Sequence, residues 1–436
     1  MELNALKKLL AEILESQHPV DVAASIEEFK DEDILLLLNM LPAETLATIF
    51  EEASESLQQK IVEFLDVSKI TAIFSHMSVD DIADILGILT ISQRKEILTH
   101  MKDQDSKEIQ MLLGFEPDSA GGIMTTQYIA LKQTLTVKEA LQKIKIICPK
   151  TETIETIFIV NNRHELIGTV DLRDILISPD EILLGEIMDA HLLYVYPDTD
   201  QEEVSLMVSK YDLNVVPVVN KKMILIGIIT IDDIIDVIVA EQTEDLLMLS
   251  GVSKDEKVGS TLSVSIRRRL PWLFVNLATA FLASFTVGMF ENEIAQVVAL
   301  AAAMPIVAGM GGNSGSQTLS IVIRSIALGE VDIRKDWKYV FHEIALGIVN
   351  GSTIGLFTGI IMYLRYHNIY LSLIIFASMI GNLMIAGLFG FIVPLFLKKK
   401  NLDPAVSSSI FLTTATDVGG FFIFLSLAKL FLPYLK

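Results

Sequence analysis

Cysteine is almost missing from this chain of 436 residues. Cys148 is the only one, so no internal disulfide and no zinc site built on several cysteines can form. A lone thiol fits a reducing compartment for the segment that carries it. The first 17 residues are amphipathic and acidic and contain no apolar signal core. We therefore expect the N-terminus to stay in the cytoplasm.

Basic residues are scarce in the first part of the chain. Residues 1–262 contain 21 Lys and Arg against 47 Asp and Glu, a net charge of −26, whereas residues 263–436 have a net charge of +5. This excess argues against a nucleic acid as partner and for cations. A solvated acidic surface without a specific ligand is the alternative.

Residues 1–120 are predicted to form an all-α domain of short stacked helices. Segments that begin at Pro42, Asp66 and Ser78 each show a cap residue, a polar turn and then an apolar face. Such stacks bury a continuous core between neighbours, as in a small superhelical solenoid. Asp80 and Asp84 stand one helical turn apart, so they either face a common cation or belong to an acidic surface.

Residues 121–180 and 181–240 contain an internal repeat. Two segments, 157–176 and 215–235, each show a β-branched run, a turn, a second strand that ends in glycine, and a helix opened by acids. Helices are predicted before them at 136–147 and 200–211. The pattern resembles a pair of cystathionine-β-synthase-type (CBS) domains, a family that often senses adenosine nucleotides or ions.

The nucleotide pattern of the CBS family is intact in the second copy only. Gly227, Thr230 and Asp233 match it, whereas Asp171 replaces the hydroxyl residue of the first copy. The resemblance therefore implies an ATP site at Thr230 and Asp233. A packing platform without ligand is the alternative.

Residues 241–262 connect the repeat to the rest of the chain. A long amphipathic helix is predicted from Asp232 to Leu249 and is ended by Gly251. Four of its acids fall near one flank, namely Asp233, Asp236, Glu241 and Glu244. A conformational signal would have to pass through this helix, unless it is only a solvated linker.

Residues 263–436 contain five apolar runs, near 270–290, 294–327, 339–364, 371–397 and 406–431, each long enough to cross a bilayer. Basic clusters precede the first run and follow the second and fourth. They are Arg267, Arg268 and Arg269; Arg334, Lys335 and Lys338; and Lys398, Lys399 and Lys400. The positive-inside rule then places the N-terminus in the cytoplasm and the C-terminus outside.

Two features of these runs point to an ion path. Asp417 lies in the middle of the fifth run, where a charge costs about 2.5–3.5 kcal/mol and marks a functional site or a paired structural acid. Pro305 and the glycines that follow it predict a break in the second helix that would line a pathway. The alternative is that these small residues allow tight helix packing.

Over its full length the chain resembles the MgtE family of magnesium channels and transporters. The most specific motifs are GMGGNSGSQT in the second run, LDPA before the fifth and TDVGG within it. The resemblance implies a multidomain membrane protein: an all-α superhelical cytosolic domain, α/β tandem CBS domains, a connecting amphipathic helix and a five-helix all-α transmembrane domain. It also implies a homodimer in the cell (inner) membrane, with a pore between the subunits and no enzymatic activity.

The resemblance also assigns roles to individual residues. Asp417 matches the ion-selective carboxylate, and Pro305, Asn313 and Thr413 are expected to line the pore with it. Mg²⁺ is then both the substrate and the ligand that closes the pore by binding to cytosolic acids. These are Asp80, Asp84, Asp200, Glu202, Asp212, Asp233, Asp236, Glu241, Glu244, Asp245 and Asp403.

Three other functions compete with this prediction. An intramembrane aspartyl protease needs two carboxylates that share a proton, but only Asp417 lies deep, because Glu343 is near the edge of a run. A CBS-gated anion or osmolyte transporter should offer a cation or helix N-termini at mid-depth, and the runs contain no Lys or Arg there. A transporter of another divalent cation such as Co²⁺ remains the nearest alternative.

Overall fold

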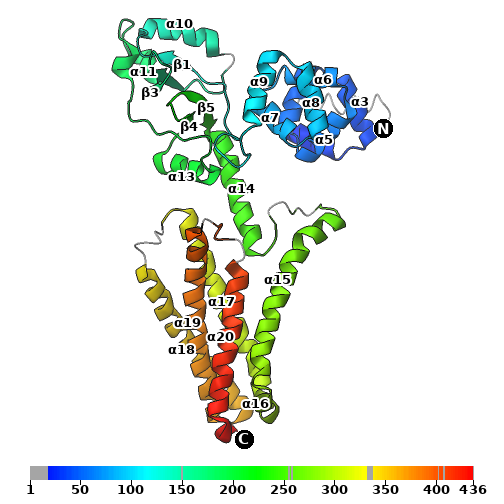
Figure 1. The fold of residues 1–436 in the computed structure, drawn as a ribbon, viewed down its shortest axis with the longest axis vertical. Helices are drawn as coiled ribbons and strands as arrows, with labels where there is room; N and C mark the ends of the chain where they lie inside the picture. Colours follow the sequence, from blue (N-terminus) through cyan, green and yellow to red (C-terminus); the bar gives the residue numbers. More distant parts are fainter. Residues whose placement is uncertain are drawn as a thin grey trace. The chain divides into compact units, whose positions relative to one another are not determined.

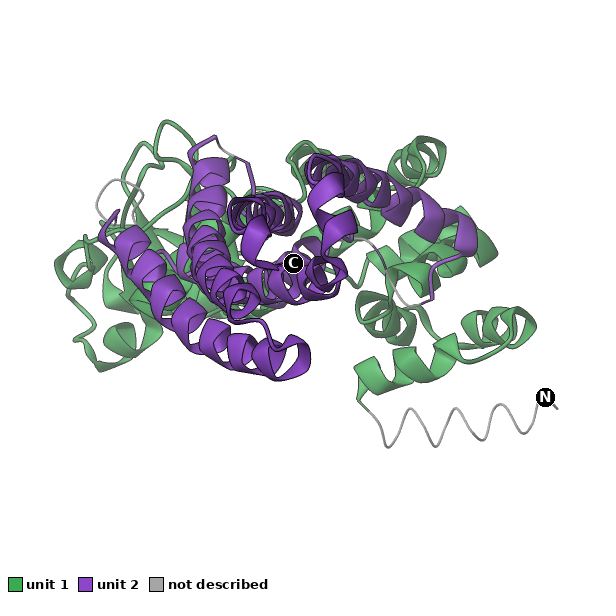
Figure 2. Cartoon of the chain, turned by 90° about the horizontal axis from the view of Figure 1, so that it is seen from below, with its two compact units in different colours: residues 1–238 green, residues 239–436 purple. Residues whose placement is uncertain are grey.

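The computed structural model describes residues 18–148, 151–253, 256, 259–330, 337–400, 402–405 and 408–435. It divides into two compact units, Met1–Ile238 and Val239–Lys436 (Figure 2). The amphipathic segment 1–17, the predicted topology markers Arg334 and Lys335, and Lys436 lie outside the described residues.

The first unit begins with a superhelix of short helices (Figure 1). Within the described residues it comprises α2 (Pro19–Glu27), α3 (Asp31–Met40), α4 (Ala43–Glu51), α5 (Glu55–Phe64), α6 (Val67–Phe74), α7 (Val79–Gly87), α8 (Ile91–His100) and α9 (Asp103–Leu112). The predicted cap residues Pro42, Asp66 and Ser78 are confirmed as the N-caps of α4, α6 and α7. Alternate helices pack against each other, α2 on α4, α4 on α6 and α6 on α8, so their apolar faces form one continuous core.

The internal repeat forms two small sheets. The first copy contains β1 (Ala130–Lys132), α10 (Val137–Ile147), β2 (Thr156–Val160), β3 (Leu166–Asp171) and α11 (Leu172–Ile177). β1 pairs parallel with β2, and β2 pairs antiparallel with β3. After α12 (Leu184–Ile187), the second copy contains α13 (Gln201–Tyr211) and the antiparallel pair β4 (Val215–Val219) and β5 (Leu225–Thr230). The helices predicted at 136–147 and 200–211 are confirmed to within one residue.

The prediction that the second strand of each copy ends in glycine is wrong. β3 and β5 continue three residues past Gly168 and Gly227. A Cβ on Gly227 would lie 2.6 Å from Met124 Sδ, and one on Gly168 would lie 2.8 Å from the Asp189 carbonyl oxygen. Both glycines therefore allow another segment to approach the middle of the strand.

The connector helix α14 (Ile231–Leu249) extends over the predicted range and crosses the boundary between the two units. Gly251 follows it with a φ of 70° and donates its backbone N–H to the Met248 carbonyl oxygen. Glycine adopts this left-handed conformation without strain, which explains why the helix ends there.

The second unit contains five helices that are long and apolar enough to cross a membrane. They are α15 (Leu262–Gly288), α17 (Val298–Ala327), α18 (Trp337–Tyr366), α19 (Ile369–Lys399) and α20 (Ser408–Leu430). The short helix α16 (Glu291–Gln296) lies between α15 and α17, and the short helix α21 (Leu432–Leu435) follows α20. The predicted second run was too long at its start, because the backbone changes direction at Val297 and separates α16 from α17.

The predicted break in the second membrane helix is also wrong. α17 is one continuous helix with Pro305 inside it. A Cβ on Gly311 would lie 2.2 Å from Asn382 Nδ2 of α19, and one on Gly315 would lie 2.6 Å from Leu412 Cδ1 of α20. These two glycines therefore serve close helix packing, the alternative that the sequence left open.

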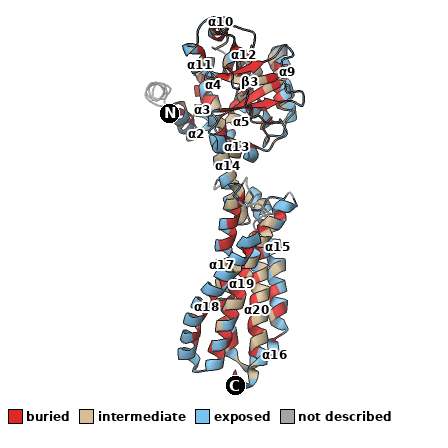
Figure 3. Ribbon diagram, turned by 90° about the vertical axis from the view of Figure 1, so that its left-hand side faces the viewer, coloured by how far each residue is buried: buried red, intermediate tan, exposed pale blue. Residues whose placement is uncertain are grey.

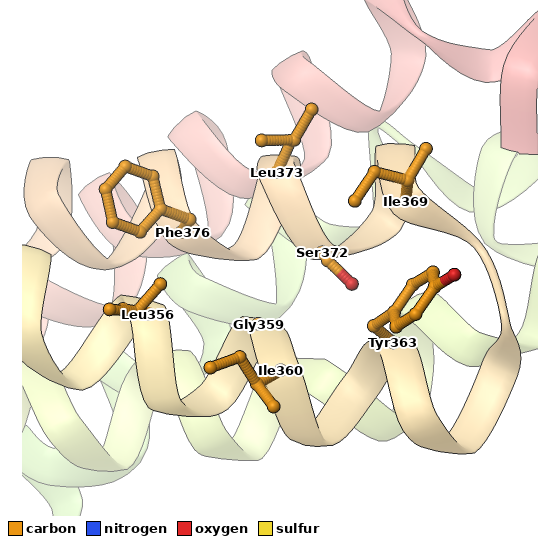
Figure 4. A pocket seen from close by; sticks show the side chains of 9 residues that line it. Leu356, Gly359, Ile360, Tyr363, Ile369, Ser372, Leu373 and Phe376 are labelled. Atoms are coloured by element: carbon orange, nitrogen blue, oxygen red, sulfur yellow. The ribbon is translucent and has the colours of Figure 1, made fainter.

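The spans differ in how much surface they leave uncovered (Figure 3). α15 has only 11% of its most apolar stretch buried, against 44% for α19. Glycines spaced four residues apart on α18, from Gly347 to Gly359, bring its backbone against α19. Beside this contact, a groove of about 290 Å³ opens between Leu356 and Ile360 of α18 and Leu373 of α19 (Figure 4). Its described lining includes no acidic or basic side chain.

Candidate cation sites

Asp417 lies in the middle of α20 and is half-buried. Thr413, one turn earlier, is exposed, and its hydroxyl donates to the Ser409 carbonyl oxygen. The next turn packs inward, because Gly420 is buried against Asn382. The Asp417 carboxylate is therefore placed at the edge between the packed and open faces of the helix.

The open face of α17 is polar. Pro305 and Asn313 are exposed, and Gln317 and Ser320 follow Asn313 at helical spacing with exposed side chains. α17 packs against both α19 and α20 through its other face. Exposed amides and hydroxyls are costly against lipid, so this stripe has to face water or another protein.

A second carboxylate within the spans belongs to Glu343 of α18. Its Oε2 accepts a hydrogen bond of 2.8 Å from the hydroxyl of Thr318, which is buried on α17. This acid is thereby engaged in holding two helices together.

The first unit contains a group of like charges that we call the α7 cluster. Its members are Glu51 of α4; Asp80, Asp81 and Asp84 of α7; Glu152; and Asp232 and Asp233 of α14. Burial, followed by the charge of Asp81, raises the pKa of Asp80. Burial and the neighbouring carboxylates also raise the pKa of Glu51 and of Glu152 to about 7. The fully ionised cluster is therefore unfavourable in this compact arrangement.

Asp84 and Asp233 belong to the same cluster from opposite elements. Desolvation, then the charges of Asp80, Asp81 and Asp233, raises the pKa of Asp84 to about 7. Part of its side chain remains exposed, so water weakens this effect and the direction is what matters. Desolvation also raises the pKa of Asp233 to about 6, against a hydrogen bond from Thr230 that lowers it.

Hydroxyl groups provide the neutral donors of the α7 cluster. Thr125 Oγ1 donates to Asp80 Oδ1 at 2.9 Å, and Thr230 Oγ1 donates to Asp233 Oδ2 at 2.6 Å. The Ser78 hydroxyl donates to Asp81 as well. Among the described residues no Lys or Arg forms an ion pair with a cluster member. A cation would supply the charge that these hydroxyls lack.

The second unit contains another group of acids, the Asp403 cluster. Burial, followed by the charges of Asp403, Glu241 and Glu244, raises the pKa of Asp245 to about 6. Asp403 Oδ1 accepts the Ala405 N–H at 2.7 Å. Met248 and Leu249 of α14 pack on the core formed by Leu319, Ile323, Ala405 and Leu412, so this cluster lies where α14 meets α17 and α20.

The other predicted cytosolic ligands do not contribute to these shifts. Asp200, Glu202, Asp212 and Asp236 are exposed. Asp200 is the N-cap of α13 and accepts the Glu202 N–H at 2.8 Å, whereas Asp212 ends that helix with a φ of 51°. Helix capping thus accounts for two of these four positions, and their role as ligands remains a prediction.

No group of three or more His, Cys, Asp or Glu side chains has the geometry to enclose a metal ion in the described parts of the chain. Within each of the two clusters the acids lie near one another, but in the described residues no three of them converge on a common metal position.

Four acids of the α7 cluster, Glu51, Asp81, Glu152 and Asp232, and the buried amide of Asn382 were not predicted as site residues from the sequence. Glu51 and Glu152 join the α7 cluster from distant segments, and Asn382 is buried between α17 and α20. A polar amide in the middle of an apolar span was the one available signal, and it pointed to Asn382.

Comparison with known families agrees with this layout. Models of the MgtE divalent cation transporter family match residues 304–427, the MgtE intracellular N domain matches residues 17–118, and CBS domains match residues 120–179 and 184–240. A protein named magnesium transporter MgtE from Thermus thermophilus is 34% identical over 431 residues, 98% of this chain and 95% of that protein. The chain belongs to the MgtE family.

Other MgtE proteins support the same assignment. The magnesium transporter MgtE of Bacillus subtilis is 31% identical and is matched over 96% of this chain and 93% of its own length. A crystal structure described as the cytosolic domain of the Mg²⁺ channel MgtE in complex with ATP is 33% identical, with a TM-score of 0.51, over 53% of this chain and 94% of that one. The chain is thus a multi-pass membrane protein with an all-α domain, a CBS pair and five membrane helices.

Proposed function

We propose that this chain mediates Mg²⁺ uptake across the cell membrane as a selective channel or transporter. The observation that carries the proposal is the position of Asp417 on α20, half-buried beside exposed Thr413 in a five-helix membrane domain. Relatives at 34% and 31% identity over nearly the whole chain are named magnesium transporters.

The chemistry of the site favours a hydrated ion. Mg²⁺ takes oxygen ligands in octahedral geometry and dehydrates reluctantly, so it is usually held through one or two carboxylates. One chain supplies a single Asp417, and a homodimer supplies two. The exposed polar stripe on α17, from Asn313 to Ser320, supports such a dimer, because a second chain would remove it from lipid.

Cytosolic Mg²⁺ closes the pore in this proposal. The α7 cluster and the Asp403 cluster both hold acids whose ionised forms are unfavourable at their positions. A bound divalent ion relieves that repulsion and favours the compact state by its difference in affinity between the two states. When cytosolic Mg²⁺ falls, the acids separate and the pore opens.

A nucleotide is the second regulatory ligand. Thr230 ends β5 and donates a hydrogen bond to Asp233 in the first turn of α14, and a homologous cytosolic domain was crystallised with ATP. Since Asp233 also belongs to the α7 cluster, ATP and Mg²⁺ would act on the same element. The positive-inside rule places these domains in the cytoplasm and the C-terminus outside.

Mg²⁺ uptake by cells that lack other magnesium transporters tests the proposal. Asp417→Ala should abolish uptake while expression and dimerisation remain at the parent level, and Glu343→Gln should retain uptake because Gln still accepts from Thr318. Parent-level uptake by the Asp417 variant would refute the pore assignment. Uptake of Co²⁺ but not Mg²⁺ by the parent would favour the alternative substrate.

A further inference from the structure

Asn382 is the one fully buried amide in the core of the described membrane helices. It lies in the middle of α19 with 0% of its surface exposed. Its Nδ2 donates to the Val307 carbonyl oxygen of α17 at 2.7 Å, and its Oδ1 has no hydrogen-bond partner among the described residues. Burying an amide in a membrane helix is unfavourable unless its groups are bonded, so apolar packing alone does not explain it.

Two glycines on two different helices make room for this side chain. A Cβ on Gly311 of α17 would lie 2.2 Å from Asn382 Nδ2, and a Cβ on Gly420 of α20 would lie 2.7 Å from Asn382 Cγ. Neither contact is possible for a residue larger than glycine without movement of the amide. Asn382 therefore fills a space that exists only because both neighbours lack a side chain.

These contacts occur at the level of the proposed pore residues. Gly420 follows Asp417 by three residues, a rise of about 4.5 Å, and Gly311 precedes Asn313 by two, a rise of about 3 Å. Two residues correspond to about 200° around a helix, so Asn382 holds α17 from the side opposite Asn313.

We propose that Asn382 is a positioning residue for the ion path. Its side chain ties α17 to α19 and separates Gly311 of α17 from Gly420 of α20. It thereby sets the spacing between the helix faces that carry Asn313 and Asp417, and with it the selectivity among divalent cations. The inference rests on the proposed function. Asn382 does not touch the ion in this assignment; it acts through the helices that carry Asn313 and Asp417.

Asn382→Leu tests the hydrogen bond, because Leu has the same branching and number of side-chain heavy atoms but can neither donate nor accept. The full chain in detergent should keep its dimer and melting temperature, since the Val307 carbonyl oxygen lies inside the continuous helix α17 and the amide oxygen that Leu removes has no partner among the described residues. In planar bilayers the permeability ratio of Mg²⁺ to Co²⁺ should shift from the parental value, because the faces that carry Asn313 and Asp417 are no longer held at the parental spacing. A parental ratio and conductance would overturn the inference, whereas a parent chain without Mg²⁺ current would instead refute the proposed function.

Gly311→Ala provides a second test that separates packing from hydrogen bonding. Alone it should lower transport, because its Cβ meets the amide. Combined with Asn382→Ala, it should restore transport but not the parental permeability ratio, since the hydrogen bond to Val307 is still missing. Full recovery of the ratio would show that volume alone matters and would overturn the positioning role.

Discussion

Asp233→Asn should stabilise the first unit without Mg²⁺ and weaken its response to Mg²⁺. The parent Asp233 has a pKa raised from 3.8 to about 6, so its charge is unfavourable in the compact arrangement. Asn has the same shape, carries no charge and still accepts the hydrogen bond from Thr230. The substitution therefore removes the repulsion and also a proposed ligand.

The expected change in the free energy of unfolding follows from the pKa shift of Asp233. A change of about two pKa units corresponds to about 3 kcal/mol, and solvent around this partly exposed carboxylate reduces the net effect to about 1–2 kcal/mol. Because the folded-state pKa lies above the unfolded value, the parent loses this stability as the pH rises from about 4 through 6. The gain from Asn should be complete at pH 8 and should fade as the pH falls towards 4.

Hydrogen–deuterium exchange on the full chain in detergent measures this directly. At pH 8 with EDTA, peptides covering α7 should exchange about tenfold more slowly in the variant than in the parent, as expected for about 1.4 kcal/mol. Saturating Mg²⁺ should protect the parent more than the variant. Glu63→Gln, an exposed acid on α5, is the matched control and should change neither. The reasoning would be refuted if parent and Asp233→Asn exchanged at equal rates in EDTA, or if Mg²⁺ protected both equally.

Three further predictions concern gating, membrane topology and the hydrogen bond from Thr125 to Asp80 in the α7 cluster. The gating variant neutralises acids from both clusters and from the start of α13, namely Asp200, Glu202, Asp233, Glu244 and Asp245. It should conduct at cytosolic Mg²⁺ levels that close the parent, as measured by patch recordings with stepped cytosolic Mg²⁺. Closure at the parent level would mean that these acids are only a solvated surface. In a Cys148→Ser background, cysteine at position 436 should react with an impermeant thiol reagent from outside and cysteine at position 399 should not, and the reverse pattern contradicts the orientation. Thr125→Val removes the donor to Asp80 and should destabilise the first unit by about 1–2 kcal/mol, whereas Thr125→Ser should not; equal exchange in both variants would rule this out.

Local signals in the sequence were sufficient for most elements. Ser78 marks the start of α7 because its hydroxyl is free to accept the Asp81 N–H at the N-cap. The span helices follow from apolar length, which depends on no distant contact. Gly251 marks the end of α14 for a similarly local reason.

What the sequence could not decide depends on contacts between distant segments. Glu51 and Glu152 reach the α7 cluster only through the stacking of α4 on α6 and the folding of the CBS pair. Gly311 fits both a helix break and a close contact, since the same missing side chain permits either. The partner across the helix, Asn382, decides between them, and its position is not encoded near Gly311.

α14 joins the two acidic clusters in one physical element. Asp233 belongs to the α7 cluster and Asp245 to the Asp403 cluster, and both lie on the same uninterrupted helix of 19 residues. In the proposed gating, a cation that binds either cluster would bias the position of this one helix, and ions bound at both clusters would both favour closure. Because Met248 and Leu249 at the end of this helix pack against α17 and α20 residues, the helix contacts the very elements that carry Asn313 and Asp417. Removing one cluster should thus raise the Mg²⁺ level needed for closure, and only the loss of both should remove the dependence on Mg²⁺.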